Sequence, residues 1–420
     1  MTFSRTPDRL NHPKLPMMPN TLQPLRVAVV ASSLRLAGAE KQTTYLTRAL
    51  LEAGIAARFF HLGEGGHYET VLRRMGIPFL QIYKRNRPMH ILARLSKAFC
   101  FFRPHIVFAP QFGDLAQGGL AGRLCNALVL GGLRSDGFYE LNSQGRRSRW
   151  MLRLAHGLVA NSHRARQNLM SRVANPPKIT VLPNVLDLSE FDARSKMPPP
   201  LSIPADRVVA VAVGSLLPNK RFDRFLKALE LARRKAPALL GVIAGSDYGS
   251  GPALTRQADE LGLTPNHVVF LGECPKVPAL LAQAGFLVLC SEYEGSPNVI
   301  LEAMAASVPV ISTRVGDAER IVLQDQTGYL VEESDIEGLA ERMVALASCA
   351  ATRMRLGSEG RARAAQEYNY ESLPIRLLGV FHDFAAHNGR RQLARTLQGR
   401  LSAGTAPPIA EALLSSDFAL

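Results

Sequence analysis

From Ser291 to Ser312 the chain reads SEYEGSPNVILEAMAASVPVIS, and an apolar run at Phe286–Leu289 precedes it. The apolar run predicts a strand, and the polar residues after it predict a loop. Pro297 favours the first position of a helix because its missing N–H would be unpaired there, and Ser296 is the natural N-cap. Val308–Ser312 predicts another strand. The stretch therefore predicts a strand–loop–helix–strand unit of an α/β protein.

Two acidic residues lie close to the start of the predicted helix. Glu294 is in the loop, and Glu302 is about one turn past Asn298. A helix N-terminus attracts anions because its first N–H groups are unpaired and carry a partial positive charge. Two carboxylates that accept hydrogen bonds from hydroxyls, beside such a helix end, suit a nucleoside diphosphate sugar. Glu302 alone would be explained equally well by the preference of acids for early helix turns, but the residues from Glu294 onward favour a ligand site.

This segment resembles the donor-site signature of the retaining family 4 glycosyltransferases, and similar segments extend from about Val27 to Tyr368. The resemblance implies the GT-B fold, in which two Rossmann-like domains with parallel sheets face each other across a deep cleft. It implies that Glu294 binds hydroxyls of the transferred sugar and that Glu302 accepts hydrogen bonds from the ribose. It also implies that the sugar and the diphosphate are held by backbone groups of Gly295, Ser296, Asn298 and Val299.

A second segment, VGSLLPNKRFD at 213–223, also resembles the family. There the family has a glycine, a basic residue and a lysine that together grip the diphosphate, and Gly214 and Lys220 match the first and last of these. Without a metal, the protein must supply the positive field that stabilises the departing phosphate. Lys220 is therefore predicted to be catalytic together with Glu294. The alternative for Lys220 is a solvated loop lysine.

Three further positions of the predicted donor site match the family less closely. Ser215 stands where the family often has arginine, so one of the two usual cations is missing or is supplied from elsewhere. Arg221 is adjacent to Lys220, but neighbouring residues point in different directions, and Lys220 is the favoured cation. Gly38 resembles the family's glycine in the loop after the first strand, where the backbone approaches the donor phosphate or the acceptor. A simple strand-to-helix turn is the alternative for Gly38.

The acceptor side of the predicted cleft is less clearly marked. Many family members have a histidine after a middle strand of the first domain, but this chain reads GLRSD at 132–136. Arg134 and Asp136 are the candidates for the acceptor-side role, and no general base is assigned. Asn184 also matches a family segment and is interpreted as a structural turn before the linker.

Two segments of the chain start alike, each with an apolar strand, a loop and a helix. The strands are Leu25–Ser32 and Val208–Gly214, and the helices are Glu40–Gly54 and Phe222–Lys235. Each resembles the first unit of a Rossmann-type domain. Neither half contains G-x-G-x-x-G, so a nicotinamide or flavin oxidoreductase is the weaker interpretation. Further strands are predicted at Ala57–His61, Ile106–Ala109, Gly157–Ala160, Ile179–Leu182, Leu239–Ala244 and Val268–Leu271.

These patterns predict an N-terminal Rossmann-like acceptor-side domain at 25–195 and a nucleotide-sugar domain at 206–372. A proline cluster at Met197–Pro204 marks the linker, predicted at 196–205, because proline does not join a sheet interior or a helix. Residues 1–24 are expected to be a disordered leader. The resemblance implies that a helix at 373–387 crosses back to the first domain, and residues 388–420 are expected to form a mobile tail.

The net charge of +15 is unevenly distributed. Residues 1–200 contain 28 Lys and Arg against 11 Asp and Glu, whereas residues 201–420 contain 22 against 24. Such asymmetry indicates an anionic partner. An anionic membrane surface that carries a lipid-linked acceptor fits better than nucleic acid, because no nucleic-acid motif accompanies the charge and a single Trp offers little for base stacking. The densest clusters are Lys84, Arg85, Arg87, Arg94 and Lys97, and Arg146, Arg147, Arg149 and Arg153.

The five cysteines are scattered and lack C-x-x-C spacing, which argues against a disulfide framework or a zinc site. No apolar run reaches the ~18 residues needed to cross a bilayer, and residues 1–24 lack the apolar core of a signal peptide. A cytoplasmic location, peripheral to the inner face of the membrane, is expected, with no metal and no cofactor.

Taken together, the motifs predict a metal-independent glycosyltransferase that moves a sugar from a nucleoside diphosphate sugar, UDP-linked, to a saccharide or lipid-linked acceptor. Retention of the anomeric configuration is implied by the resemblance only. The alternative is a nonenzymatic nucleotide-sugar-binding scaffold of the same fold.

Overall fold

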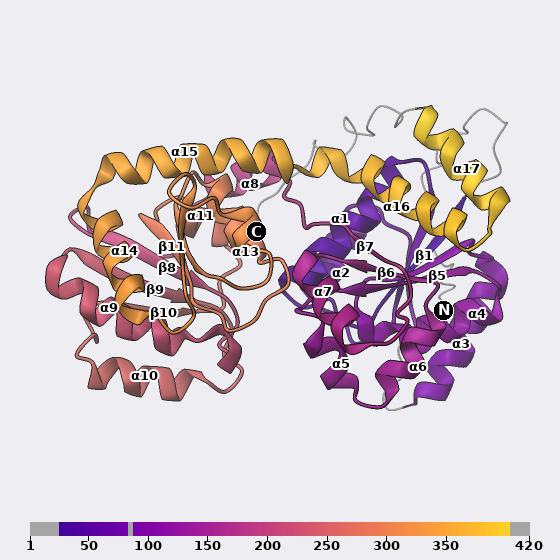
Figure 1. The fold of residues 1–420 in the computed structure, drawn as a ribbon, viewed down its shortest axis with the longest axis horizontal. Helices are drawn as coiled ribbons and strands as arrows, with labels where there is room; N and C mark the ends of the chain where they lie inside the picture. The colour runs from indigo at the N-terminus through magenta and orange to yellow at the C-terminus, as the bar shows by residue number, and fades with distance from the viewer. Residues whose placement is uncertain (1–24, 83–86, 404–420) are drawn as a thin grey trace, which may run out of the picture.

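The computed structural model describes residues 25–82 and 87–403, and it contains two α/β units, each built on a parallel sheet (Figure 1). The predicted leader at 1–24, Lys84 and Arg85, and residues 404–420 of the predicted tail lie outside the described residues. The predicted fold class is confirmed, since each sheet is covered by helices on both faces.

The N-terminal sheet has seven parallel strands in the order β3-β2-β1-β4-β5-β6-β7. Its central strands are apolar and buried, as strands covered on both faces must be. The strand bounds are β1 (Arg26–Ala31), β2 (Ala56–His61), β3 (Phe79–Gln81), β4 (Ile106–Ala109), β5 (Leu128–Leu133), β6 (Gly157–Ala160) and β7 (Ile179–Val181).

Helices pack against both faces of this sheet. One apolar cluster joins the sheet to α1 (Gly38–Glu52) and α2 (His67–Arg74), and another joins its opposite face to α3 (Pro88–Phe102) and the helices that follow. The remaining helices of this unit are η1 (Phe112–Asp114), η2 (Leu115–Gly119), α4 (Leu120–Leu124), α5 (Phe138–Gln144), α6 (Arg147–Leu154) and α7 (His163–Arg172).

The C-terminal sheet has six parallel strands in the order β10-β9-β8-β11-β12-β13. The strands are β8 (Val208–Val213), β9 (Leu239–Ala244), β10 (Val268–Gly272), β11 (Phe286–Leu289), β12 (Val310–Thr313) and β13 (Gly328–Val331). The helices are α8 (Leu188–Ser195), η3 (Pro218–Lys220), α9 (Phe222–Lys235), α10 (Gly251–Glu260), α11 (Val277–Leu281), α12 (Asn298–Ala305), α13 (Ala318–Ile321), α14 (Ile336–Ser348) and α15 (Ala350–Glu367).

The chain passes between the two units twice, and the two passages lie side by side. Leu186 N–H donates to the carbonyl of Tyr368, and Tyr370 N–H donates to the carbonyl of Leu186. Helix α8 follows the first passage and packs on the C-terminal unit, because Phe191 belongs to the same apolar cluster as α11 and α12. The predicted boundary at residue 195 is therefore too late by the length of α8. Residues 196–207 form neither helix nor strand.

After the second passage, η4 (Tyr370–Ser372) leads into α16 (Leu373–His387) and α17 (Arg391–Ser402). Both helices return to the N-terminal unit (Figure 1), where Phe381, Phe384 and Leu397 join the apolar cluster of α1. The expectation of a mobile tail from residue 388 is wrong for Arg391–Ser402, because their apolar side chains are buried in that cluster. Within the described residues, no helix combines the length and apolar character needed to span a membrane.

The strands predicted in each half are present, with small differences in their bounds. Strand β12 begins at Val310 because Val308 N–H is used to close α12, where it donates to the carbonyl of Ala303. Helix α12 begins at Asn298 with Pro297 as its N-cap, and no side chain caps it. The prediction of Ser296 as the N-cap is therefore wrong. Strands β3, β5 and β13 were not predicted.

Candidate functional site

The predicted donor residues lie at the carboxyl edge of the C-terminal sheet. Strands β8 and β11 are neighbours in the sheet. From β8 the chain adds β9 and β10 outward on one side, and from β11 it adds β12 and β13 outward on the other side. Loops after adjacent strands then lead to opposite sides of the sheet, which leaves a crevice where ligands of open α/β sheets bind. The loop from Gly214 to Lys220 follows β8, and the loop that holds Glu294 follows β11. Sequence motifs 74 residues apart therefore meet at one point.

Lys220 and Glu294 form an ion pair at this point. Lys220 Nζ donates to Glu294 Oε1 at 2.5 Å, and Ser291 Oγ donates to the same oxygen at 2.7 Å. The side chains are 22% and 13% exposed, so the pair is largely buried but still reached by solvent. Gly214 lies against the aliphatic stem of Lys220, where an added Cβ would be 3.6 Å from Cε. The two predicted catalytic residues thus form one unit, a cation and an acid at the carboxyl edge of the sheet.

A second ion pair crosses from one domain to the other. Lys41 on α1 donates from Nζ to Glu302 Oε1 on α12 at 2.8 Å, and the two side chains are 12% and 14% exposed. Burial by itself lowers the pKa of Lys41, but the attractions of Glu302, Tyr68 and Glu190 together outweigh it, and the pKa lies above its ordinary value. The sequence did not single out Lys41, although it lies three residues after Gly38 at the start of the predicted helix.

The first residue of α12 is held by two side chains of the N-terminal domain. Asn298 Oδ1 accepts hydrogen bonds from Gln42 Nε2 at 3.0 Å and from Asn184 Nδ2 at 2.9 Å. Asn184 Nδ2 also lies 2.9 Å from the carbonyl of Ser296. A Cβ at Gly38 would collide with the Asn298 amide, so glycine is required for α1 to approach this closely. We call residues 290–297, between β11 and α12, the donor loop. Asn184 was interpreted as a turn residue, but it also holds the donor loop in place through the carbonyl of Ser296.

The glycine of the donor loop packs against the turn that was predicted to face the acceptor. A Cβ added to Gly295 would lie 2.6 Å from the carbonyl oxygen of Ser135 and 2.7 Å from Asn161 Oδ1. On the other side of the loop, Asp317 N–H donates to the carbonyl of Gly295 at 2.9 Å. The Asp317 carboxylate accepts the N–H groups of His163 at 2.8 Å and Arg164 at 3.1 Å, at the start of α7. Asp317 therefore links the donor loop to the N-terminal domain, and no sequence motif indicated it.

The start of α12 retains the features of an anion site. No side chain caps the helix at Pro297, and the first N–H groups of a helix have no partner within the helix. The backbone N–H groups of Asn298 and Val299 are among these first groups of α12. Ser296 itself is 7% exposed. The arrangement combines helix amides, two cations and two carboxylates, which is a set suited to a diphosphate with hydroxyl-bearing rings at both ends.

Some predicted residues lie apart from this centre. Arg221 donates to both oxygens of Asp223 at 2.9 Å and lies 3.6 Å from Glu292, so its guanidinium is engaged within its own loop. Ser215 is partly buried in the loop after β8. Asp136 Oδ1 accepts the N–H of Tyr139 at 2.7 Å and so shapes the turn before α5.

Arg134 is half-buried in the turn that packs on the donor loop. Its Nε donates to the carbonyl of Pro110 at 3.1 Å, and its own carbonyl accepts from Asn161 Nδ2 at 3.2 Å. Burial lowers the pKa of Arg134 to about 10. One of its terminal nitrogens is buried without a partner among the described residues. Of the two acceptor-side candidates, Arg134 is thus the one with a nitrogen that can still donate a hydrogen bond.

Two buried carboxyl groups lie at the carboxyl edge of the N-terminal sheet. Asp114 follows β4 in η1, and burial raises its pKa to about 7. Glu40, on α1, is 6% exposed and accepts from Gln111 Nε2 at 3.3 Å. Neither acid was recognised from the sequence as part of a site. No cluster of His, Cys, Asp or Glu suited to a metal ion occurs within residues 25–82 and 87–403.

Two family models match this chain. Residues 36–190 match the model described as Glycosyltransferase Family 4, and residues 193–363 match the one described as Glycosyl transferases group 1. The first match ends and the second begins within α8, close to the passage between the two units. Together they contain both ion pairs of the site.

Curated relatives share about a third of their residues with parts of the chain. A GDP-mannose-dependent alpha-(1-6)-phosphatidylinositol monomannoside mannosyltransferase of Mycolicibacterium smegmatis is 31% identical over 225 residues, which cover 50% of this chain and 56% of that protein. A D-inositol 3-phosphate glycosyltransferase of Mycobacterium bovis is 30% identical over 245 residues, which cover 56% of this chain and 50% of that protein. The chain thus spans about half the length of these curated relatives in the matched regions.

Solved structures share the fold at lower sequence identity. The Anabaena protein Alr3699/HepE, in complex with UDP and glucose, superposes with a TM-score of 0.75 at 19% identity, covering 85% of this chain and 99% of that one. A sucrose-phosphate synthase from Thermosynechococcus elongatus gives a TM-score of 0.69 at 19% identity, covering 86% of this chain and 100% of that one. These similarities establish the two-domain GT-B fold.

Proposed function

Since the chain belongs to glycosyltransferase family 4, we propose that it transfers a sugar from a nucleoside diphosphate sugar to a saccharide or lipid-linked acceptor. The observation that carries the proposal is the pair of contacts Lys220–Glu294 and Lys41–Glu302 on either side of the uncapped start of α12. A donor of this class has a diphosphate for the amides and cations and a ring with hydroxyls for each acid. UDP is the proposed nucleotide, because a structural neighbour of the same fold was solved with it.

The chemistry assigned to the site is stabilisation of charge. As the bond from the anomeric carbon to the phosphate breaks, negative charge builds on the departing diphosphate. Lys220 and the amides of Asn298 and Val299 supply the positive field that this charge requires, without a metal ion. Glu294 accepts hydrogen bonds from the sugar hydroxyls, and its contact with Lys220 keeps both groups in position. Configuration is proposed to be retained, as is usual for the family.

Lys41 is proposed to supply the second cation of the donor site, because Ser215 stands where the family often has an arginine. It brings a positive charge from the N-terminal domain to the donor helix and holds Glu302 where ribose hydroxyls would meet it. Because the lysine and the glutamate belong to different domains, the same contact would also favour a closed cleft. Donor binding and domain closure would then depend on one ion pair.

The acceptor is proposed to approach from the N-terminal side, past the turn that carries Arg134. The excess of basic residues in the first half favours an acceptor held at the inner face of an anionic membrane, as in cell-surface polysaccharide or glycolipid synthesis. The departures from the family pattern at Ser215 and at 134–136 favour the second candidate function, a nucleotide-sugar-binding scaffold without transferase activity.

Two measurements on the purified chain test these candidates. Thermal unfolding with a panel of nucleotide sugars is expected to show a rise in melting temperature with a UDP-sugar, because a ligand that binds only the folded state stabilises it. Release of UDP in the presence of an acceptor panel, undiminished by EDTA, is expected for the transferase. Binding without transfer or hydrolysis would support the scaffold, and the absence of any nucleotide-sugar effect would contradict both.

A further inference from the structure

The N-terminal domain has one layer that is nearly devoid of acidic residues. Between Glu69 and Asp187 the acids are Asp114, Asp136 and Glu140. Asp114 and Glu140 are buried, and Asp136 is used in the turn before α5. The same interval contains basic residues on α3, α4, α6 and α7. Excess positive charge is therefore a property of a folded surface and not only of a stretch of sequence.

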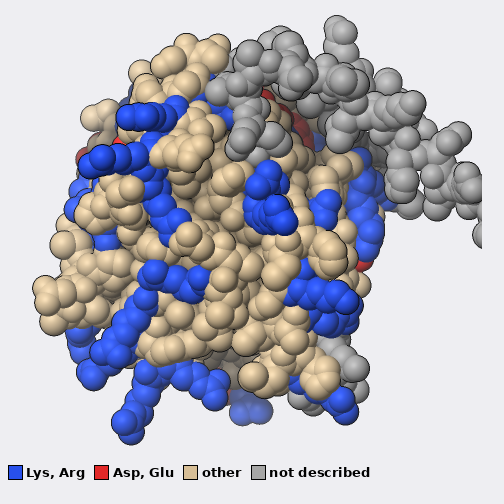
Figure 2. Space-filling model, turned by 90° about the vertical axis from the view of Figure 1, so that its right-hand side faces the viewer, with Lys and Arg blue, Asp and Glu red and all other residues tan. Residues whose placement is uncertain are grey.

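Helices α3, α4 and α6 form this layer on one face of the sheet. Both α3 and α6 contact η2, and α3 also contacts α4. Figure 2 views the molecule from the side on which Figure 1 places α3 and α4, and shows Lys and Arg spread over it with few Asp or Glu. We call this surface the basic face and define it by its exposed residues, which are Met89, Lys97, Phe101, Arg103, Arg123, Leu124, Arg149, Trp150 and Arg153.

Large apolar side chains project from the basic face among its cations. On α3, Met89, Ala93, Lys97 and Phe101 are spaced by four residues and all are exposed, so they form one row along the helix. Met89 is 73% exposed, Phe101 78%, and Leu124 on the adjacent α4 68%. Solvated basic surfaces do not need such side chains. Apolar tips between lysines and arginines are typical of a surface that meets the boundary between lipid headgroups and acyl chains.

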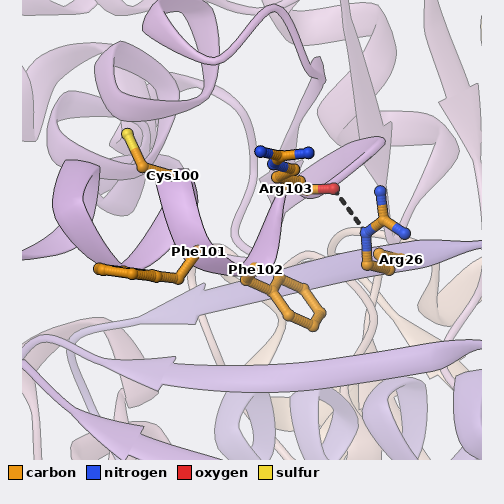
Figure 3. A pocket seen from close by; sticks show the side chains of 5 residues that line it. All are labelled: Arg26, Cys100, Phe101, Phe102 and Arg103. Atoms are coloured by element: carbon orange, nitrogen blue, oxygen red, sulfur yellow. Dashed lines mark hydrogen bonds between the residues drawn. The ribbon is translucent and has the colours of Figure 1, made fainter.

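A cavity at the end of α3 is lined by both cationic and apolar side chains. It has a volume of about 380 Å³ and is lined by Arg26, Cys100, Phe101, Phe102 and Arg103, none of which is acidic. Arg26 Nε donates to the carbonyl of Arg103 at 2.7 Å, so its guanidinium has no carboxylate partner in this contact. Figure 3 shows the two guanidinium groups on one side and the ring of Phe101 directed away from them. An anionic headgroup would offset the proximity of the two positive charges.

The layer also leads to a contact between the two domains. Helix α5 contacts α6, and Tyr139 on α5 stacks on Tyr293 of the donor loop with ring centroids 6.3 Å apart. Tyr139 is 53% exposed. A surface bound along α3 and α6 would therefore continue to the point where the two domains meet.

We propose that the basic face docks on an anionic membrane surface, with Met89, Phe101 and Leu124 inserted among the headgroups and the lysines and arginines paired with lipid phosphates. Membrane docking itself does not depend on the proposed function. Its biological role, which is to bring a lipid-linked acceptor to the donor site, rests on that function. Single-stranded nucleic acid is the competing partner for a basic surface. Nucleic-acid binding relies on cations and on aromatic rings that stack on bases. The exposed aliphatic side chains of Met89 and Leu124 cannot stack in this way, and they favour a lipid surface.

Flotation of the full chain with vesicles tests the proposal. Strong binding is expected to vesicles of phosphatidylcholine mixed with phosphatidylglycerol, and weak binding to phosphatidylcholine alone. Reversing two charges with Lys97→Glu and Arg149→Glu is expected to lower partitioning at least about 30-fold, since each basic residue near the surface contributes about a factor of five. Lys227→Glu with Lys235→Glu changes the net charge equally on exposed sites of α9 and is expected to leave partitioning within about twofold.

The apolar contribution is tested separately. Phe101→Ser with Leu124→Ser is expected to lower partitioning about tenfold without changing the charge. Met354→Ser, at a residue of α15 that is 74% exposed, is the matched control. Equal losses for the charge reversals on the basic face and on α9, or no loss for the Phe101 and Leu124 variant, would overturn the proposal. So would charge-sensitive binding of a fluorescent single-stranded RNA without vesicle binding. Thermal stabilisation by a UDP-sugar, measured on every variant, shows whether the donor site is intact, so the two proposals fail independently.

Discussion

The ion pair between Lys41 and Glu302 predicts a measurable coupling between the two domains. Lys41 Nζ and Glu302 Oε1 are 2.8 Å apart, and the two side chains are 12% and 14% exposed, so the pair is mostly buried. Removing one partner of a buried pair costs roughly 3–5 kcal/mol, whereas an exposed pair contributes less than about 1 kcal/mol. Because both side chains keep some exposure to solvent, we expect Lys41→Met to cost about 2 kcal/mol, between these limits.

The expected observable is a lower melting temperature. For a unit of roughly 150–250 residues, 1 kcal/mol corresponds to about 2–4 °C, so Lys41→Met should lower the melting temperature by about 4–8 °C. Glu302→Gln keeps the shape of the side chain but removes its charge, and should have a comparable effect. The double variant should lose less than the sum of the single variants, with a coupling energy of about 1–2 kcal/mol.

The assay is thermal unfolding of the four proteins, each with and without a UDP-sugar. Arg194→Met is the control, because Arg194 pairs with Glu190 at 3.3 Å on one helix with about a third of each side chain exposed. It should shift the melting temperature little and leave stabilisation by the donor unchanged. Single-variant effects that add within about 0.5 kcal/mol would refute the coupling. Full donor stabilisation of Glu302→Gln would refute its role at the ribose.

The remaining predictions concern the donor site and the buried acids. Lys220→Met is expected to lower the transfer rate about 10²–10³-fold in single-turnover kinetics, because it removes positive charge at the departing phosphate, and an unchanged rate would exclude Lys220 from catalysis. Gly38→Ala is expected to weaken donor binding about tenfold by equilibrium titration, because its Cβ collides with an Asn298 amide that Gln42 and Asn184 hold in place; unaltered affinity would show that α1 moves away freely. Asp114 has a pKa of about 7 in the folded protein against 3.8 as its ordinary value, so its contribution to stability is complete below about pH 4 and is lost as the pH rises through about 7. Asp114→Asn should remove that dependence, worth at most about 4 kcal/mol, and unfolding measured across pH 4–8 with equal slopes for both proteins would contradict the assignment.

Much of the donor half of the site could be predicted from local rules. The spacing of Glu294 and Glu302, the apolar strands around them and the loop from Gly214 to Lys220 all depend on residues close together in the chain. Strand β11 and helix α9 have the predicted bounds for the same reason. Strand β5 was missed because two glycines, Gly131 and Gly132, interrupt its apolar pattern. Glycine is needed at these positions because a Cβ would collide with Leu115 and Pro110, which only the folded structure brings there.

The contacts that complete the site could not be predicted in this way. Lys41 and Glu302 are 261 residues apart, and Asn184 and Asn298 are 114 apart. Helical and strand periodicity determines which face of its own element a side chain occupies, and these periods extend over a few residues only. Which side chain lies opposite depends on how the two sheets are oriented around the paired passages at Leu186 and Tyr370.

The amino-acid sequence by itself therefore determined the two parallel α/β units, the acids and lysine of the donor motif and the excess of positive charge in the first half, because each follows from local pattern or composition. Only the tertiary structure decided that Lys41 joins α12, and Asp317 the donor loop, to the N-terminal domain, that α17 folds onto the first sheet, and that cations and exposed apolar side chains share one face. Those features depend on the relative positions of distant segments, which are set by the packing of whole layers.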